Sequence, residues 1–253
     1  MSNENAIVKC SKCLNDERTN TWIFGECLPV PAFGEINSAK VQIATVGLNP
    51  SSTEFYAGER LKHPSQRLPA LSDFRAKSRE DLTADDMAEA TGKRFEYFNG
   101  GARQAHEWFK KLGRILNTAN TSWCYADGSA VHLDIVACVT RKKWSDVNED
   151  ARKMIAVNCR EHLEHTVSKL PENVTLLFDG KSSCEAMTGF ANAEWKSLGH
   201  FTDLDGNSKP LRVRSGTVKI GAISRKYAAW NYPAKYLSNE ALPRVGEWVR
   251  GVM

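Results

Sequence analysis

Apolar residues occur along the chain in short continuous runs that are rich in β-branched side chains. Such runs predict strands buried on both faces of a sheet, because half-exposed strands alternate apolar and polar residues instead. The runs are Val41–Val46, Val131–Cys138, Val174–Phe178 and Val218–Ile223. Leu211–Arg214, in which apolar and basic residues alternate, is expected as a further strand, and a short strand is expected at Trp22–Phe24.

Apolar residues at helical spacing lie between and after these runs. One predicted helix is marked by Ala105, Trp108, Phe109, Leu112, Ile115 and Leu116, a second extends from about Glu149 to Lys169, and a third contains Val245, Trp248 and Val249. A shorter helix is expected over Ala84–Thr91, with Thr83 as its N-cap. His162 and His165 are expected on a helix surface. Strands that alternate with helices predict an α/β fold with a largely parallel sheet.

The strand Val41–Val46 stops at Gly47-Leu-Asn-Pro-Ser51. Glycine permits backbone angles that are closed to other residues, and proline fixes a bend. Asn49 and Ser51 are therefore presented at the carboxyl end of a strand, where open α/β sheets bind their ligands. An ordinary turn between a strand and a helix is the alternative interpretation.

Composition adds only broad limits. At 253 residues and 42% hydrophobic content, the chain is expected to form a single domain over 1–253, interrupted by a charged insertion at about 52–94. A net charge of +4 permits nucleic-acid binding without requiring it. Neither a membrane-length apolar run nor a secretion signal is present, so we expect a cytoplasmic protein without a membrane partner.

The seven cysteines are an odd number, which argues against a disulfide framework. Cys10 and Cys13 form a CxxC pair, which by itself is compatible with a redox pair, half of a zinc site or chance. In a reducing compartment, closely spaced thiols are better candidates for metal or cluster ligands.

Three further features are candidates for binding. Phe98 adjoins Asn99-Gly100-Gly101 and is the aromatic residue most available to a ligand. Asp134 lies within an apolar strand, where a carboxylate is costly unless it is paired or used. Arg141, Lys142 and Lys143 precede Trp144, a composition that suits phosphate contact and base stacking.

Taken together, these motifs resemble the uracil-DNA glycosylase superfamily from about Cys10 to Pro233. Gly47–Ser51 is similar to the first motif of the mismatch-specific and single-strand-selective branches, whose asparagine holds the attacking water. The resemblance implies a three-layer α/β/α fold with a central, mostly parallel sheet of four to five strands. It also implies that Asn49 is catalytic and that Gly47, Leu48 and Ser51 line the base pocket.

Other residues are similar to the iron–sulfur branch of that superfamily. The matching segments are Cys13-Leu14, Arg18-Thr19, Phe24-Gly25-Glu26 and Tyr97–Arg103, in which Phe98 would stack on a flipped base. Cys138 and Cys159 flank the basic loop and the following helix, as that branch's second ligand pair does. The resemblance therefore implies a [4Fe–4S] cluster on Cys10, Cys13, Cys138 and Cys159. Zinc and buried free thiols remain the alternatives.

The chain departs from the superfamily pattern in two places. Ile223-Ser-Arg-Lys226 stands where a histidine is usual. Arg225 or Lys226 could stabilise the departing base or enter the duplex in its place, or these residues and Ser224 could only contact phosphates. Asp134 stands where a base-reading asparagine is usual.

An ionised aspartate only accepts hydrogen bonds, and acidic side chains pair with the exocyclic amine of cytosine. Asp134 therefore predicts a modified cytosine as the excised base, since removal of plain cytosine would destroy the host genome. Such bases are typical of phage DNA, so host defence is plausible. Activation of the water is the alternative role for Asp134.

The leading prediction is a monomeric, DNA-binding glycosylase that flips out a modified base and hydrolyses its N-glycosidic bond, leaving an abasic site. Ordinary uracil or mismatch repair is a second hypothesis. A catalytically inactive nucleic-acid-binding module is a third.

Overall fold

The computed structural model describes residues 3–55, 67–99, 107–187, 194–202 and 206–253. The described helices are α1 (Asn3–Val8), α2 (Lys12–Asn15), α3 (Ala84–Phe95), α4 (Glu107–Ala119), α5 (Glu149–Lys169), α6 (Lys181–Ala186) and α7 (Ala241–Val252). The described strands are β1 (Ala32–Phe33), β2 (Ile43–Gly47), β3 (Ala130–Asp134), β4 (Thr175–Asp179), β5 (Lys196–Thr202), β6 (Ser208–Ile220) and β7 (Ile223–Trp230).

The strands form one mixed sheet of seven in the order β1-β3-β2-β4-β7-β6-β5. The four strands β3, β2, β4 and β7 are parallel, whereas β1, β6 and β5 extend the sheet by antiparallel pairing. The predicted α/β class is therefore confirmed. The expected count of four to five strands is too low, because the β6–β7 and β5–β6 pairs add an antiparallel extension to the parallel part.

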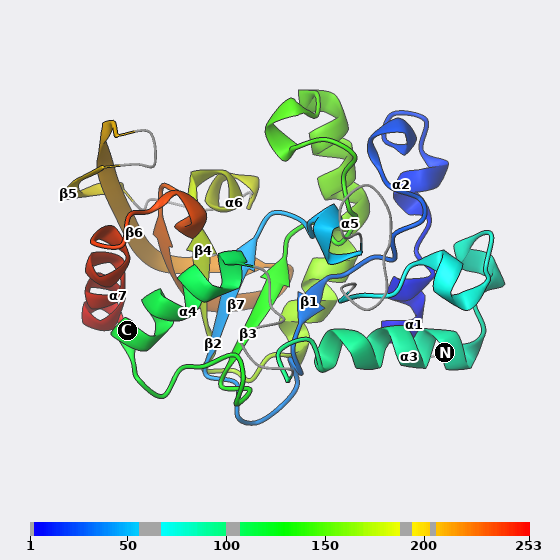
Figure 1. Ribbon diagram of the computed structural model, residues 1–253, viewed down its shortest axis with the longest axis horizontal. Coiled ribbons are helices and arrows are strands. Elements are labelled where there is room, and N and C mark those ends of the chain that lie inside the picture. Colours follow the sequence, from blue (N-terminus) through cyan, green and yellow to red (C-terminus); the bar gives the residue numbers. More distant parts are fainter. Residues whose placement is uncertain (1–2, 56–66, 100–106, 188–193, 203–205) are drawn as a thin grey trace.

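Helices pack on both faces of the sheet (Figure 1). On one face, Leu177 and Trp230 belong to a core that contains Leu112 of α4 and Val249 of α7. On the other face, Phe178 belongs to a core with residues of α5. This division follows from strand geometry, since successive side chains point to opposite faces.

Local signals placed several elements correctly. Helix α5 has the predicted bounds, and Asn148 caps it by accepting a hydrogen bond from the Ala151 amide at 2.7 Å. Thr83 caps α3 as predicted, accepting from the Asp86 amide at 3.2 Å, although α3 continues to Phe95.

Three strand predictions need correction. Val218–Ile223 is not one strand: Val218–Ile220 end β6, Ile223 begins β7, and the turn of the β6–β7 hairpin lies between them, where Gly221 has a φ of +58°. Trp22–Phe24 straddles the end of a 3-10 helix, and Ile23 makes an isolated bridge to Thr140. Strand β3 stops at Asp134, so this carboxylate lies at a strand end and not in the middle.

The described parts of the charged insertion contribute apolar side chains to the core. Phe55, Leu68 and Met87 belong to the same core as α4 and α7. Buried Glu54 accepts hydrogen bonds from Arg67 Nε at 2.7 Å and from the Tyr97 hydroxyl at 2.6 Å. These contacts tie both sides of the insertion to the domain, while residues 56–66 lie outside the described part.

Candidate functional site

The Gly47–Ser51 loop leaves the carboxyl end of β2 beside the end of β3. Gly47 pairs with Asp134 in the parallel register. The backbone contact continues past the strands, because the amides of Ile135 and Val136 donate to the carbonyls of Gly47 and Leu48 at 3.2 and 2.8 Å. The predicted loop and the predicted carboxylate therefore meet at one edge of the sheet.

Asn49 and Ser51 have their own partners in this loop. The Asn49 amide Nδ2 donates to Thr140 Oγ1 at 3.2 Å and to the Pro50 carbonyl at 3.1 Å. The Ser51 hydroxyl accepts from the Thr53 amide at 3.3 Å and caps the short helix that begins at Ser52. Asn49 is half-buried and thereby oriented, whereas the Ser51 hydroxyl has a structural partner.

Asp134 is 3% exposed, and its Oδ1 lies 3.4 Å from Nε2 of His132. That separation is longer than a well-formed hydrogen bond. Among the described residues, neither Asp134 Oδ2 nor His132 Nε2 has a hydrogen-bond partner. Burial raises the pKa of Asp134, while the nearby imidazole of His132 opposes that rise. The pair thus presents unused polar atoms in a buried position.

A chain of short contacts extends from this pair into the core. His132 Nδ1 lies 2.8 Å from the Thr45 hydroxyl, which in turn lies 2.6 Å from the Tyr125 hydroxyl. All these side chains are buried. Since Nδ1 is engaged by Thr45, the orientation of the imidazole is fixed and Nε2 is directed toward Asp134.

Gly47 is the residue around which these groups converge. A Cβ at this position would lie 3.0 Å from Asp134 Oδ1, from His132 Nε2 and from the indole of Trp108. Contacts this short are tighter than most Cβ contacts, so a larger residue would force the three neighbouring side chains to shift. The close approach of these side chains therefore favours glycine here.

Trp108 covers Gly47 and connects it to a second buried carboxylate, Asp179, at the end of β4. Asp179 Oδ2 accepts from the Trp108 indole at 2.6 Å, while Oδ1 accepts from the Trp230 indole and the Ala234 amide, each at 2.7 Å. Burial raises the pKa of Asp179 to about 6, and these hydrogen bonds limit the rise. We call Thr45, Tyr125, His132, Asp134 and Asp179 the polar cluster.

Phe98 is not available to a ligand in this structure, contrary to the prediction. It is 4% exposed and stacks on Tyr125 with the ring centroids 4.4 Å apart. Edge contacts to Tyr97 and Phe109 complete its surroundings. Phe98 belongs to the core because these three rings surround it, although the next residue, Asn99, is exposed. Gly100–Arg103 lie outside the described residues.

Arg141, Lys142 and Lys143, in the basic segment after β3, are exposed, which leaves the prediction of phosphate contact open to test. Arg141 lies over the Phe24 ring at 5.0 Å and Lys142 over the Trp22 ring at 5.4 Å. Lys143 lines a large groove together with Trp144.

Ser224, Arg225 and Lys226 lie away from this edge, which argues against the prediction that Arg225 or Lys226 stabilises the departing base; the alternative of phosphate contacts stays a prediction for exposed Ser224 and Lys226. They begin β7, whereas Trp230 ends it opposite Asp179. Arg225 is 8% exposed and donates to the carbonyls of Glu172 and Leu170 at 3.0 and 3.1 Å. It stabilises the carbonyl end of α5, so it can neither enter a duplex nor reach a departing base at Gly47.

Three of the four predicted metal ligands lie together on the opposite face of the sheet. The sulfurs of Cys13, Cys138 and Cys159 lie within 4.8 Å of one another, with Cys13 and Cys159 3.9 Å apart. We call these residues the thiol cluster. Cys10 lies outside this distance and is half-buried. Burial is the main reason that the pKa of Cys10 is raised, and the charge of an ionised Cys138 adds to the rise.

The protonation of the thiol cluster is uneven. Hydrogen bonds from Cys13 and Cys159 lower the pKa of Cys138, and the same contacts raise the pKa of the other two thiols. His162 is 9% exposed, not on the surface as expected, and its charge also favours the Cys138 thiolate. A buried thiolate with adjacent thiols is a donor set that could bind a metal ion.

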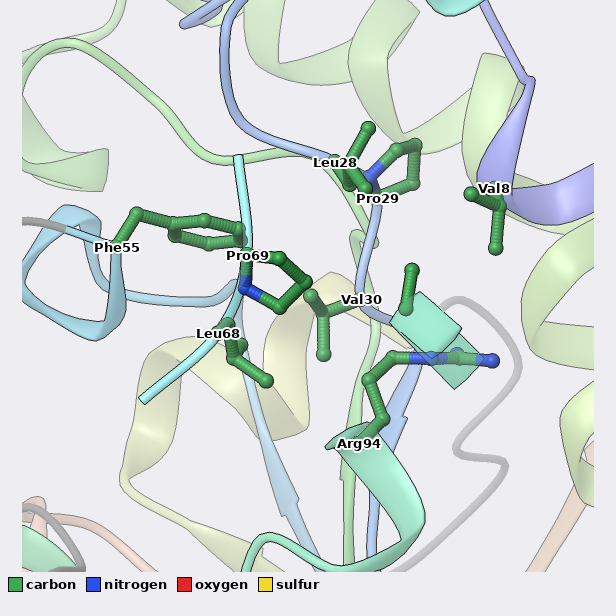
Figure 2. A pocket seen from close by; sticks show the side chains of 9 residues that line it. Val8, Leu28, Pro29, Val30, Phe55, Leu68, Pro69 and Arg94 are labelled. Atoms are coloured by element: carbon green, nitrogen blue, oxygen red, sulfur yellow. The ribbon is translucent and has the colours of Figure 1, made fainter. Parts of the chain in front are cut away.

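Two cavities in the described part of the chain illustrate its hollows, and neither of these two has Asn49 or Asp134 in its lining. Figure 2 shows the smaller one, which apolar side chains and Arg94 enclose. Its volume of about 10 Å³ accommodates no more than a water molecule. The larger one, about 850 Å³, extends along α5 and reaches Leu48.

Sequence reasoning missed His132, Thr45, Tyr125, Trp108 and Asp179. His132 had a usable signal, because it precedes Asp134 by two residues in one strand and therefore shares its face. Asp179 had a similar one, as the carboxylate that ends the third predicted strand. The remaining contacts depend on how α4 packs on the sheet.

Comparison with known proteins adds no assignment: no family model, curated protein or solved structure matches the chain. None of the described helices combines the length and apolar character that crossing a membrane requires.

Proposed function

We propose that the protein is a DNA glycosylase that excises a modified cytosine by hydrolysis and leaves an abasic site, in defence against phages whose DNA carries such bases. The observation that supports it most is the pairing of Gly47 with Asp134 at the ends of adjacent parallel strands. The parallel core with helices on both faces likewise supports a three-layer fold of the uracil-DNA glycosylase type.

In this proposal, Asn49 positions the water that attacks the sugar carbon as the bond to the base breaks. The bond electrons leave with the base, so a nearby donor lowers the barrier. His132 is the candidate donor in place of the histidine missing at Ile223–Lys226, because its Nε2 lies next to Asp134 and has no hydrogen-bond partner in the described part of the chain. No covalent intermediate is needed when water is the nucleophile.

The protonation state of Asp134 determines which base it prefers. An ionised carboxylate accepts from the exocyclic amine of cytosine, whereas a protonated one also donates and can pair with uracil. Because burial raises the pKa of Asp134, we expect preference for the cytosine-type base to increase with pH. Uracil repair is therefore the second candidate function, favoured by the protonated form.

A base that enters beside Gly47 needs space that the Trp108 indole now occupies. The indole is planar and donates one N–H to Asp179, as a nucleobase could. We therefore propose that base binding displaces Trp108. If the Trp108 indole remains in place when DNA binds, no base can enter beside Gly47, and the protein would be an inactive nucleic-acid-binding module.

The test is incubation of the protein with duplex and single-stranded DNA that carries uracil, hydroxymethylcytosine or glucosylated hydroxymethylcytosine, followed by detection of abasic sites at pH 5.5 and pH 8. Asn49→Ala and Asp134→Asn should each reduce product at least about a hundredfold, while exposed Asp85→Asn should match the wild type. Product from uracil alone would favour repair. No product from any substrate would reject the enzyme and leave the binding module.

We further propose that the thiol cluster, with Cys10, holds a metal. The [4Fe–4S] cluster is the form that the family resemblance implies. The 3.9 Å between the sulfurs of Cys13 and Cys159 also suits one tetrahedral zinc, in which thiolates about 2.3 Å from the ion lie about 3.8 Å apart. Iron with acid-labile sulfide and visible absorption would identify the cluster, and zinc in a colourless protein would exclude it. The group would tie α2 to α5 and takes no part in bond cleavage.

A further inference from the structure

The larger cavity is a groove of about 850 Å³ that lies along α5 and reaches α6 and the β6–β7 hairpin. Figure 1 shows α5 and α6 on the same side of the molecule. Its basic lining residues are Lys143, Arg152, Lys153, Arg160, Lys219 and Lys235. The acidic ones are Glu149, Glu164 and Glu185. The groove therefore carries an excess of positive charge.

Ion pairs within helices account for all three carboxylates of the groove. Lys153 pairs with Glu149 and Arg160 with Glu164, each at 2.8 Å, and Lys181 pairs with Glu185 at 3.1 Å. Among the described residues, no carboxylate pairs with Lys143, Arg152, Lys219 or Lys235. These four side chains extend from the loop after β3 to the hairpin, and their charge is complementary to a polyanion.

Aromatic and aliphatic side chains lie between these cations. Trp144 is half-buried, Tyr236 is 44% exposed and Val157 is 61% exposed. The ammonium nitrogen of Lys235 lies 4.8 Å from the centroid of the Tyr236 ring, so this ring has a cation next to it. Exposed rings between basic side chains are the arrangement that binds unpaired bases and their phosphates together.

We propose that this groove binds single-stranded DNA, with phosphates on the unpaired cations and bases on Trp144 and Tyr236. A single strand fits better than a duplex, because stacking on these rings requires exposed base faces. Leu48, in the loop after β2, forms part of the lining, so the bound strand leads to the candidate active site. This surface extends the proposed function but does not depend on it, because binding is measured without any reaction.

The test is fluorescence anisotropy of a labelled 12-nucleotide oligothymidylate, titrated with the full chain at several salt concentrations. Arg152→Ser combined with Lys219→Ser should raise Kd at least about tenfold and reduce the slope of log K against log salt by about 1.4, since each phosphate contact on a single strand contributes about 0.7. Trp144→Ala should raise Kd about fivefold or more with little change in the slope.

The matched control is Lys40→Ser combined with Lys93→Ser, which removes the same charge from exposed positions outside the groove. Equal binding by the groove variant and this control would overturn the proposal. So would displacement of the oligonucleotide by polyglutamate at an equal concentration of charges, which would assign the groove to an acidic polypeptide. Asn49→Ala should bind like the wild type, so loss of glycosylase activity and loss of groove binding are separate results. Circular dichroism of each variant verifies folding, and Lys219→Glu alone provides a second test.

Discussion

The polar cluster and the thiol cluster lie on opposite faces of the sheet and are joined by one short segment. Asp134 faces α4, and Cys138, four residues later, faces α5. Both clusters are buried and both contain groups with displaced pKa values. They differ in how the charge is accommodated. Burial favours the neutral form of Asp134, whereas hydrogen bonds from two thiols stabilise Cys138 as a thiolate.

This difference indicates two kinds of use. A carboxyl group whose pKa is raised by burial, beside an imidazole nitrogen with no hydrogen-bond partner among the described residues, is suited to exchange protons or hydrogen bonds with a bound molecule. A buried thiolate among thiols is suited to bind a metal, which replaces the thiol protons. Burial alone favours the neutral form of an acid in both clusters. The neighbouring groups therefore decide whether the pKa of the buried acid is raised or lowered.

The largest expected effect tests whether the thiol cluster is a metal centre. Cys138→Ser should eliminate bound metal and lower the free energy of unfolding by more than about 4 kcal/mol, because structural zinc alone contributes about 10–16 kcal/mol in small domains. Metal analysis and denaturant unfolding measure both effects. Cys124→Ser, which changes an exposed thiol outside the cluster, should leave both unchanged. Full metal content in Cys138→Ser would show that Cys138 is not a metal ligand and that the two clusters do not differ in this use.

A smaller effect is expected from Asp179 and depends on pH. Its folded pKa of about 6 lies above its unfolded value, so the folded state binds more protons between the two values. Its contribution to stability is therefore fully present below about pH 4 and is lost as pH rises through about 6, a difference of about 3 kcal/mol. Asp179→Asn should lack this loss in urea unfolding from pH 4 to pH 7. Parallel pH profiles of the variant and the wild type would indicate that Asp179 is ionised throughout.

The smallest effect sharpens the description of the hydrogen-bond chain. Tyr125→Phe removes the hydroxyl that lies 2.6 Å from Thr45 and should cost about 1 kcal/mol of unfolding free energy. Denaturant unfolding measures this, with Tyr236→Phe, at an exposed position, as the control. An equal effect of both substitutions would mean that the hydrogen bonds between Tyr125, Thr45 and His132 add nothing to the free energy of unfolding. His132 would then be held by packing alone.

The sequence predicted those elements whose signals are local. Helix α5 has both a capping asparagine and a long regular segment, and the strand at Val174–Phe178 differs from β4 by one residue. The β6–β7 hairpin was missed because Val218–Ile223 is apolar throughout apart from Lys219 and Gly221. The consequence for function was large, since Arg225 moved from the predicted site to the opposite end of a strand.

The candidate site was predicted in part for the same reason. Gly47–Ser51 was predicted at the end of a strand, and parallel strands bring their carboxyl ends together. Asp134 was predicted within its strand, so its place beside this loop at the end of β3 emerged only from the structure. Phe98 was misassigned because its neighbours in sequence suggested an exposed loop, whereas its burial depends on Tyr125 and Phe109 from distant segments. The contact between Trp108 and Asp179 likewise requires the position of α4, which no local pattern specifies.

The segment from Asp134 to Cys138 has one further consequence. The Ile135 and Val136 amides of this segment donate hydrogen bonds to the carbonyls of Gly47 and Leu48. A shift of Asp134 or of Cys138 would therefore also disturb the Gly47–Ser51 loop. If the thiol cluster holds a metal, removal of that metal would free Cys138, and the segment of four residues would pass this movement to the Asp134 carboxylate. Oxidation of the thiols on one face of the sheet would then lower activity at the other face, although no atom that takes part in the reaction had changed.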